Sequence, residues 1–178
     1  SRYPLAEPDY TGKRTLDFTP FEEALAALSP DRAAALDGLL AGATLCDMQT
    51  LMARGELSAA ELVTYYVARI RRYDVGKLNA VMELGPQAMQ VATVLDAERA
   101  SGSTRGPLHG IPVLIKDNIA TGDGMHTAAG AWALRGWQPR RDAFLVAQLR
   151  RAGAIILGKT NLSEWANYMD PSMPNGFS

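Results

Sequence analysis

The sequence predicts an α/β layered domain, in which helices pack on a buried sheet. Two apolar runs, residues 111–115 and 154–157, are rich in β-branched side chains and too short for typical helices, so each reads as a buried strand. A long polar loop and a run with helical periodicity lie between them. The order strand, loop, helix, strand is typical of this architecture.

The first 42 residues are predicted to form an irregular arm followed by two short helices. Thr19 is followed by a proline and is expected to cap the first helix. Ser29 is also followed by a proline and is expected to cap the second, which extends to Leu40. Residues 43–178 are expected to form the main domain.

Helices and one more strand are expected before the first buried strand. Ser58 and Glu61 form a capping box that opens an amphipathic helix. The expected elements are a short helix over 47–53, the amphipathic helix with Leu62, Tyr66, Ile70 and Tyr73 on one face, a strand over 78–84 and a helix from 85 to about 100.

The segment after the long loop is predicted to hold the second buried strand between two helices. Asn161 and Glu164 are expected to cap the later helix, which ends near Asn167, and residues 158–161 to form the turn before it. Asp142 is expected to cap the earlier helix, with four side chains facing inward: Phe144, Leu145, Leu149 and Ala152.

Composition excludes several classes of protein. With 47% hydrophobic and 21% charged residues, the chain is globular, and its net charge of -1 gives no reason to expect a nucleic-acid or anionic-membrane partner. It contains no apolar run of 18 residues, so no membrane span is expected. Cys46 is the single cysteine, which leaves the compartment open: a soluble protein, cytoplasmic or secreted after removal of an unseen leader.

Two patterns that suggest bound groups are set aside on physical grounds. Residues 153–160 match the spelling of a phosphate loop, but such a loop needs flexible backbone after a strand, and here its variable residues are themselves the predicted strand. His109 and His126 have no second histidine at a metal-ligand spacing and are expected to be hydrogen-bonding loop residues. We therefore expect no nucleotide, metal ion or other cofactor.

Lys116 is the residue that points to chemistry, because it ends the first buried strand. One interpretation is structural: its stem packs on apolar neighbours while its ammonium reaches water or a carboxylate such as that of Asp117. The other is catalytic: in an apolar pocket the ammonium loses hydration, its pKa falls, and the neutral amine acts as a general base near neutral pH. The residue pattern alone leaves both interpretations open.

Three runs in the sequence resemble motifs of one enzyme family. They are GPLHGIPVLIKDN at residues 106–118, TAAG at 127–130 and GAIILGKTNLSEW at 153–165. In this order and spacing they resemble the N-terminal part of the amidase signature family, and within it peptide amidases and related bacterial and fungal amidases. The resemblance extends over about residues 44–167.

The resemblance implies an α/β/α fold with a mixed central sheet, of which this chain holds the N-terminal portion and is incomplete. It also implies an amide hydrolase that uses a serine nucleophile, a second serine after a cis peptide bond, and a lysine, which by motif position is Lys116. Both serines belong to a glycine- and serine-rich segment that does not occur in these 178 residues. Ser163, Ser172 and Ser178 lie outside any such segment and are not assigned as nucleophiles.

The resemblance further implies which residues contact a small amide or peptide-amide substrate. Lys159 is expected to be a structural residue that forms an ion pair or hydrogen bonds rather than a second base, and Trp165 has core packing as an alternative role. The implied lining consists of Thr127, Ala128, Ala129 and Gly130 near the reacting carbon, and of Trp165, Ala166, Asn167, Tyr168 and Met169 after the second strand.

The chain alone is expected to be inactive, and its partner to be the C-terminal remainder of the same enzyme, which carries both serines. It would be a cleaved fragment, a shortened expression product or part of a polypeptide interrupted by a gap, and it should expose an unpaired sheet edge. Two other functions stay open: the amidase subunit of a glutamine-dependent transamidation complex, and a non-catalytic subunit or binding module that keeps the fold.

Overall fold

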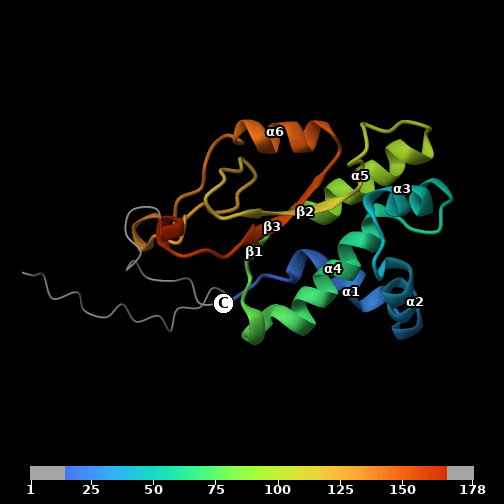
Figure 1. Cartoon of the computed structure of the whole chain (residues 1–178), viewed down its shortest axis with the longest axis horizontal. Coiled ribbons are helices and arrows are strands. Elements are labelled where there is room, and N and C mark those ends of the chain that lie inside the picture. Colours follow the sequence, from blue (N-terminus) through green and yellow to red (C-terminus); the bar gives the residue numbers. More distant parts are fainter. Residues whose placement is uncertain (1–14, 168–178) are drawn as a thin grey trace, which may run out of the picture.

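The computed structural model describes residues 15–167, and a three-stranded mixed sheet lies at their centre. Its strands are β1 (Val81–Leu84), β2 (Pro112–Lys116) and β3 (Ile155–Thr160). β3 is the middle strand, antiparallel to β1 and parallel to β2 (Figure 1). The predicted α/β class and the mixed sheet are confirmed.

Helices cover both faces of this sheet. α4 (Ala59–Tyr73) and α5 (Ala88–Ala100) share a core with Ile155 and Leu157 of β3. α6 (Phe144–Arg151) packs on the other face, where Val146 contacts a cluster that includes Ile156. The alternation of side chains along β3 therefore separates two cores, and Figure 1 shows α6 and α4 on opposite sides of the sheet. Every helix within residues 15–167 is too short or too polar to cross a bilayer.

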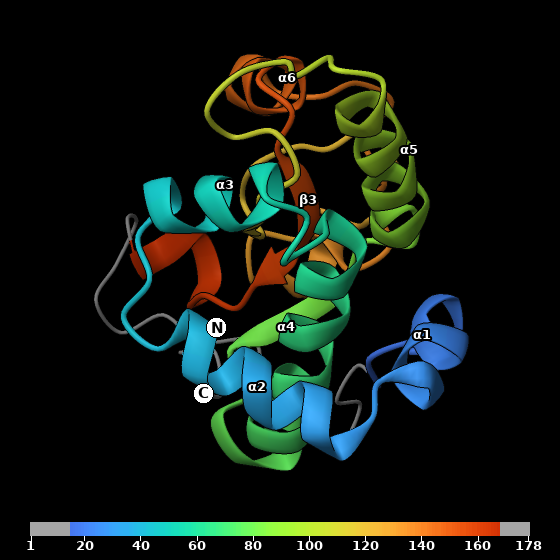
Figure 2. The ribbon, with the colours of Figure 1, turned by 90° about the vertical axis from the view of Figure 1, so that its right-hand side faces the viewer.

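The N-terminal helices lie beside α4 (Figure 2). They are α1 (Glu22–Ala27), α2 (Pro30–Leu40) and α3 (Leu45–Ala53). The Ser29 side chain accepts the backbone N–H of Arg32, as expected for the cap of α2. The expected Thr19 cap is wrong: a 3-10 turn, Thr19–Phe21, precedes α1, and the Asp17 carboxylate accepts the Thr19 N–H.

The capping box before α4 is confirmed, because Ser58 and Glu61 each accept the other's backbone N–H. The Asp96 carboxylate of α5 accepts two further N–H groups at this helix end, which places negative charge at the positive end of the helix. The apolar face of α4 is shorter than predicted. Leu62 is buried, but Tyr73 is exposed and lies against the guanidinium groups of two arginines.

β1 is shorter than the strand predicted over residues 78–84. Asp74–Leu78 forms a helical turn, and Asn79 has a left-handed φ of 51° that reverses the chain. The Asp74 carboxylate accepts the N–H groups of Ala80 and Val81, so extended pairing begins only at Val81.

Two predictions for the C-terminal segment are wrong. Asp142 does not cap α6; its carboxylate accepts the Gly122 N–H and the Arg150 Nε–H. Phe144 and Leu145 do not face inward: their side chains are 78% and 53% exposed. The helix has apolar residues on two sides, and packing against Ile156 selects the side that carries Val146.

The turn predicted over residues 158–161 is also wrong, because β3 continues to Thr160. Gly158 marks a close approach of two strands rather than a turn, since a Cβ on it would lie 2.3 Å from the Glu83 carbonyl oxygen of β1. The segment that spells a phosphate loop is thus a paired strand, as expected from its apolar residues.

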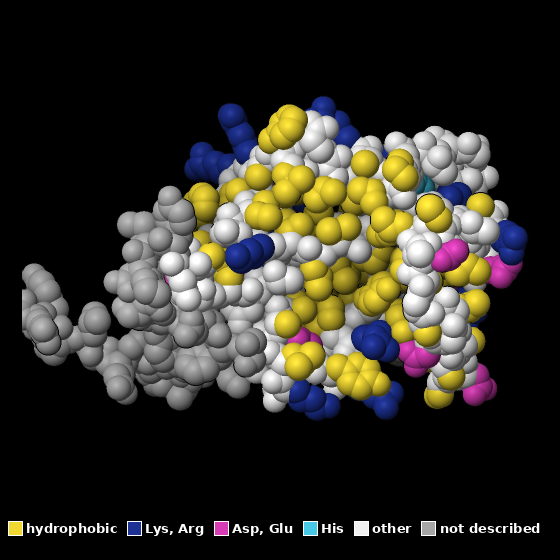
Figure 3. Space-filling model, in the orientation of Figure 1, with side chains coloured by type: hydrophobic (Ala, Val, Ile, Leu, Met, Phe, Trp, Pro, Cys, Tyr) yellow, Lys and Arg dark blue, Asp and Glu magenta, His cyan; other side chains and the backbone are white. Residues whose placement is uncertain are grey.

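β2 is an edge of the sheet within the described residues, pairing there with β3 alone. Its Leu114 side chain is 37% exposed. Figure 3 shows hydrophobic side chains gathered over the middle of the face turned to the viewer. The expected sheet edge is therefore present in this part of the chain.

Candidate functional site

The candidate site lies where β2 and β3 end, because parallel strands bring their carboxyl ends to one edge of a sheet. Lys116 is the last residue of β2 and pairs in register with Thr160, the last residue of β3. Its side chain is exposed. Asp117 follows it and is fully buried, and its backbone N–H donates to the Thr160 carbonyl oxygen at 3.1 Å. The buried strand pair thus fixes the backbone that presents the lysine.

Asp117 also attaches the predicted substrate wall to the end of β2. Its Oδ2 accepts the Ala128 N–H at 3.1 Å, and its backbone carbonyl accepts the Ala129 N–H at 3.1 Å. Thr127, Ala128 and Ala129 are buried at this junction, and Gly130 is exposed. The predicted wall is therefore attached to Asp117, the residue that follows Lys116.

A third segment joins this junction from the end of β3. The Trp165 N–H donates to the Ala129 carbonyl oxygen at 2.9 Å. Gly130 has a φ of 69°, and a Cβ there would lie 2.9 Å from the backbone of Ser163. The glycine is required because the two segments touch through their backbones.

The helix predicted to end near Asn167 is a single 3-10 turn, Glu164–Asn167. Trp165 and Ala166 have left-handed φ values of 48° and 56°, which an ordinary helix does not contain. Trp165 is 45% exposed and is part of no hydrophobic core within the described residues. Tyr168 and Met169 lie outside the described residues.

Lys159 is a second fully buried charged residue at this site, after Asp117. Its Nζ donates to the Ile119 carbonyl oxygen at 2.6 Å and to Thr127 Oγ1 at 2.8 Å. Its side chain is fully buried. Burial is the largest influence and lowers the pKa of Lys159 from the ordinary value of 10.5, while nearby carboxylates, that of Asp117 first, act in the opposite direction.

This lowered pKa predicts a pH dependence of stability. Between the folded pKa of Lys159 and the ordinary value of 10.5, the unfolded chain binds more protons than the folded one, so this residue's contribution to stability rises with pH. Lys159→Met cannot titrate. We compare the free energy of unfolding of the complete gene product with that of its Lys159→Met variant. The unaltered protein should gain stability relative to the variant as the pH rises toward 10.5.

The measurement is urea unfolding at several pH values. Lys77→Met is the matched control, because Lys77 is exposed and its Nζ donates to the carbonyl oxygen of Arg72. The difference measured for Lys159→Met should rise with pH more steeply than the difference measured for the control. A difference for Lys159→Met that is flat or falls with pH would contradict the prediction.

Both histidines make structural hydrogen bonds. His109 is fully buried; its Nε2 lies 2.9 Å from the Leu95 carbonyl oxygen, and its Nδ1 accepts the Arg105 N–H. His126 is held by Glu83 of β1, whose carboxylate accepts the His126 N–H and lies 2.9 Å from Nδ1. Within residues 15–167 the structure groups no three His, Cys, Asp or Glu side chains in positions to hold a metal ion.

The Glu83–His126 pair and the contacts of Lys159 were not foreseen in the sequence. Glu83 reaches His126 because of the register of β1 on β3, and that register depends on Gly158, which was predicted to lie in a turn. The sequence signal for this pair was Glu83, a charged residue within the strand predicted over residues 78–84. Together these contacts make a rigid loop beside an exposed primary amine, an arrangement that can bind a substrate group and accept a proton.

Comparison with known proteins places this geometry in a family. The amidase family model matches residues 61–175. The native peptide amidase of Stenotrophomonas maltophilia is 49% identical, with a TM-score of 0.69 over 72% of this chain and 26% of that one. An amidase family protein of Bacillus anthracis is 38% identical, with a TM-score of 0.80 over 89% of this chain and 32% of that one.

A glutamyl-tRNA(Gln) amidotransferase subunit of Salinispora arenicola is 40% identical over 128 residues, which are 71% of this chain and 26% of that protein. The chain spans about a quarter of the length of the curated relatives it matches. The similarity covers β2, the wall and β3, which are the segments that meet at Lys116. On this match, the chain belongs to the amidase family.

Proposed function

We propose that the protein containing this chain hydrolyses the carbon–nitrogen bond of a linear amide, and that Lys116 is its general base. The observation that carries the proposal is the position of Lys116. It ends β2 at the junction where the wall of Thr127, Ala128, Ala129 and Gly130 is attached to Asp117. The amine is thus presented by fixed backbone at a surface open to a second segment of protein and to substrate.

The proposed chemistry is acyl transfer through a Ser-cisSer-Lys triad, with both serines outside this chain. In this proposal the Lys116 amine accepts the proton of the bridging serine, which accepts the proton of the nucleophilic serine. The nucleophilic serine attacks the amide carbon and forms an acyl-enzyme. The leaving amine of the substrate takes up the proton, which returns from Lys116 through the bridging serine. Water then hydrolyses the acyl-enzyme. Lys116 therefore holds the proton from the attack of the serine until the amine of the substrate leaves.

The partner that supplies the serines is proposed to be the remainder of the same polypeptide. Two observations support this: the chain spans about a quarter of its relatives' length, and β2 presents an edge and the exposed Leu114 beside Lys116. A strand that paired with β2 would bury this edge and place the following residues next to the amine. The chain by itself is expected to be inactive for the same reason.

A peptide amide or other small amide is the proposed substrate. The identity of 49% with a peptide amidase supports this class. Trp165 is exposed at the junction and offers an apolar surface to an acyl group; the exposed Ala166 continues that surface, and the half-buried, polar Asn167 follows it. Residues 168 and 169 complete the proposed lining.

A second candidate is the amidase subunit of a glutamine-dependent transamidation complex. The 40% identity with the amidotransferase subunit from Salinispora arenicola favours it. In that case ammonia released from glutamine would pass to a partner, and turnover would depend on that partner and on ATP. A non-catalytic subunit that keeps the fold is a third reading, which predicts no turnover under any condition.

The test is release of ammonia from a C-terminal peptide amide by the complete gene product. We expect turnover without ATP or any partner protein, and none from residues 1–178 alone. Activity only with glutamine, ATP and a co-purified partner would replace the hydrolase with the transamidation complex. Absence of activity on peptide amides, simple amides and glutamine would overturn both.

A further inference from the structure

We propose that Lys159 is a positioning residue for this site, because it joins the turn after Lys116 to the substrate wall and holds both in place. The hydrogen bonds themselves are a property of the fold, whereas their effect on turnover rests on the proposed amide hydrolysis. We call the set of Lys159, Ile119 and Thr127 the Lys159 clamp.

The clamp connects Lys116 to the wall through a continuous series of hydrogen bonds. The Ile119 N–H donates to the Lys116 carbonyl oxygen at 2.9 Å and closes the turn after β2. Lys159 Nζ donates to the Ile119 carbonyl oxygen at 2.6 Å and, from the same atom, to Thr127 Oγ1 at 2.8 Å. One nitrogen therefore sets the distance between the lysine-bearing turn and the first residue of the wall.

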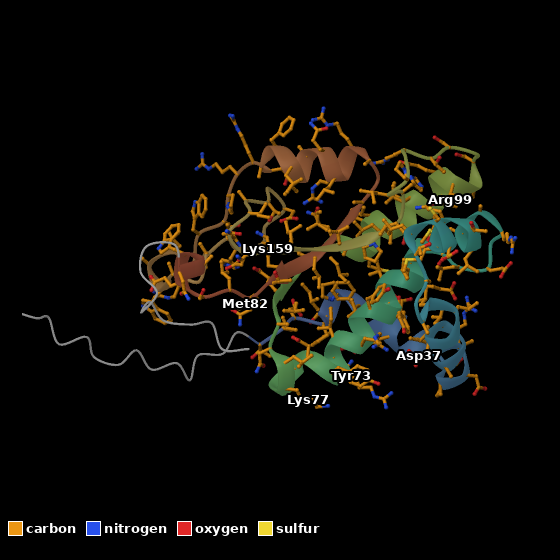
Figure 4. All side chains as sticks on the ribbon, in the orientation of Figure 1. Asp37, Tyr73, Lys77, Met82, Arg99 and Lys159 are labelled. Carbon is orange, nitrogen blue, oxygen red and sulfur yellow. The ribbon has the colours of Figure 1, made fainter. Side chains whose placement is uncertain are left out.

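The atom that sets this distance is itself fixed. Lys159 belongs to β3, the middle strand, and pairs with Glu83 of β1 on one side and with Ile115 of β2 on the other. Figure 4 labels Lys159 near the end of β3 and the loop that follows β2. A side chain rooted in the centre of the sheet loses little freedom when it makes these bonds, so it holds the two loop segments against a rigid support.

Burial excludes a direct catalytic role within this chain and favours the positioning role. The Lys159 side chain has no exposed surface, and its nitrogen is occupied by two acceptors of the same chain, so it does not contact substrate. Carboxylates surround it at the sheet edge and in the loop, those of Asp117, Asp123, Glu83 and Asp142, and they favour its charged form. An ammonium is a suitable clamp because it has three N–H donors and no acceptor.

The first test compares Lys159→Met with Lys77→Met in the complete gene product. Methionine keeps most of the apolar stem and removes both hydrogen bonds, and Lys77 is the exposed lysine used as the control (Figure 4). We expect Lys159→Met to lower kcat by about 10²-fold, the effect of a displacement of about 1 Å at a catalytic group, with a much smaller change in KM. Lys77→Met should leave both constants unchanged.

A second pair of variants keeps the test valid if Lys159→Met fails to fold. Thr127→Val removes the acceptor Oγ1 and keeps the shape, whereas Thr127→Ser retains the hydroxyl. Because Thr127 also belongs to the proposed wall, this pair is compared by amide hydrogen exchange rather than by kcat. We expect residues 117–130 to exchange faster in Thr127→Val than in Thr127→Ser. Equal exchange in the two Thr127 variants would overturn the clamp. A kcat in a folded Lys159→Met protein within about twofold of the control would overturn its catalytic consequence.

Hydrogen exchange separates failure of the clamp from failure of the proposed function. Amides of residues 117–130 should exchange faster in Lys159→Met and Thr127→Val than in Lys77→Met, whether or not the protein hydrolyses an amide. Unchanged exchange in this segment would overturn the clamp itself. If the unaltered gene product has no amidase activity while exchange responds as expected, the clamp stands and the proposed function fails.

Discussion

Replacement of Lys116 by alanine in the complete gene product is expected to lower kcat by about 10³- to 10⁴-fold, the upper range for loss of a positioned general base. Within residues 15–167 the Lys116 side chain is exposed and packs in none of the hydrophobic cores, so its removal leaves those cores unchanged, and the midpoint of urea unfolding should hardly move. Steady-state kinetics with a peptide amide and urea unfolding of the same samples measure the two effects.

Lys116→Arg tests whether the amine or only its charge is required. Arginine keeps a long stem and a positive charge but does not lose its proton at working pH, so it cannot act as the base. We expect Lys116→Arg to be as inactive as Lys116→Ala, with Lys77→Ala as the control that keeps full activity. Turnover near that of the unaltered protein in Lys116→Ala would remove Lys116 from the mechanism.

Replacement of Gly158 by alanine should give the largest loss of stability among single methyl additions in the described residues. The new Cβ would lie 2.3 Å from the Glu83 carbonyl oxygen, and that oxygen belongs to strand backbone that cannot turn away as a side chain does. Separation of β1 from β3 would also disturb Glu83 and its bonds to His126. We expect a loss of about 3 kcal/mol in the free energy of unfolding.

Gly38→Ala is the matched control, because it adds the same methyl group where nothing lies within 4 Å. Gly38 is inside α2, where alanine is the better helix former, so this change should stabilise by about 0.5–1 kcal/mol. Urea unfolding of both variants measures the difference in sign. A Gly158→Ala protein as stable as the unaltered one would mean that β1 does not approach β3 as closely as described.

Local signals predicted the starts of α2 and α4 correctly, because a helix cap acts within one turn of the chain. Ser29 and Ser58 cap the helices they were expected to cap, since a cap depends only on the next three residues. Asp142 failed as a cap because Arg150, eight residues later, and the loop at Gly122 hold its carboxylate. That competition is a property of tertiary packing, which local patterns do not contain.

The site could be predicted in part, through the resemblance to a family rather than through residue patterns. The resemblance implied that Lys116, the wall at Thr127 and the segment at Trp165 belong together, and the fold places these segments in contact. It did not predict how they are held. The bonds of Asp117 to the wall and of Lys159 to Ile119 depend on the order and register of the strands. The sequence pattern did not show this register, because Gly158 and Lys159 of β3 resemble turn residues.

The edge strand β2 also has a consequence for synthesis on the ribosome. In any polypeptide where the strand that pairs with β2 is made later, the backbone edge of β2 and its exposed Leu114 stay uncovered among other nascent chains, a state that favours pairing between sheet edges. Pro112 offers no N–H to an intruding strand at one end, and Lys116 carries its charge at the other. The two flanking residues act as gatekeepers, so the lysine proposed to serve turnover would also keep the half-made enzyme from aggregating.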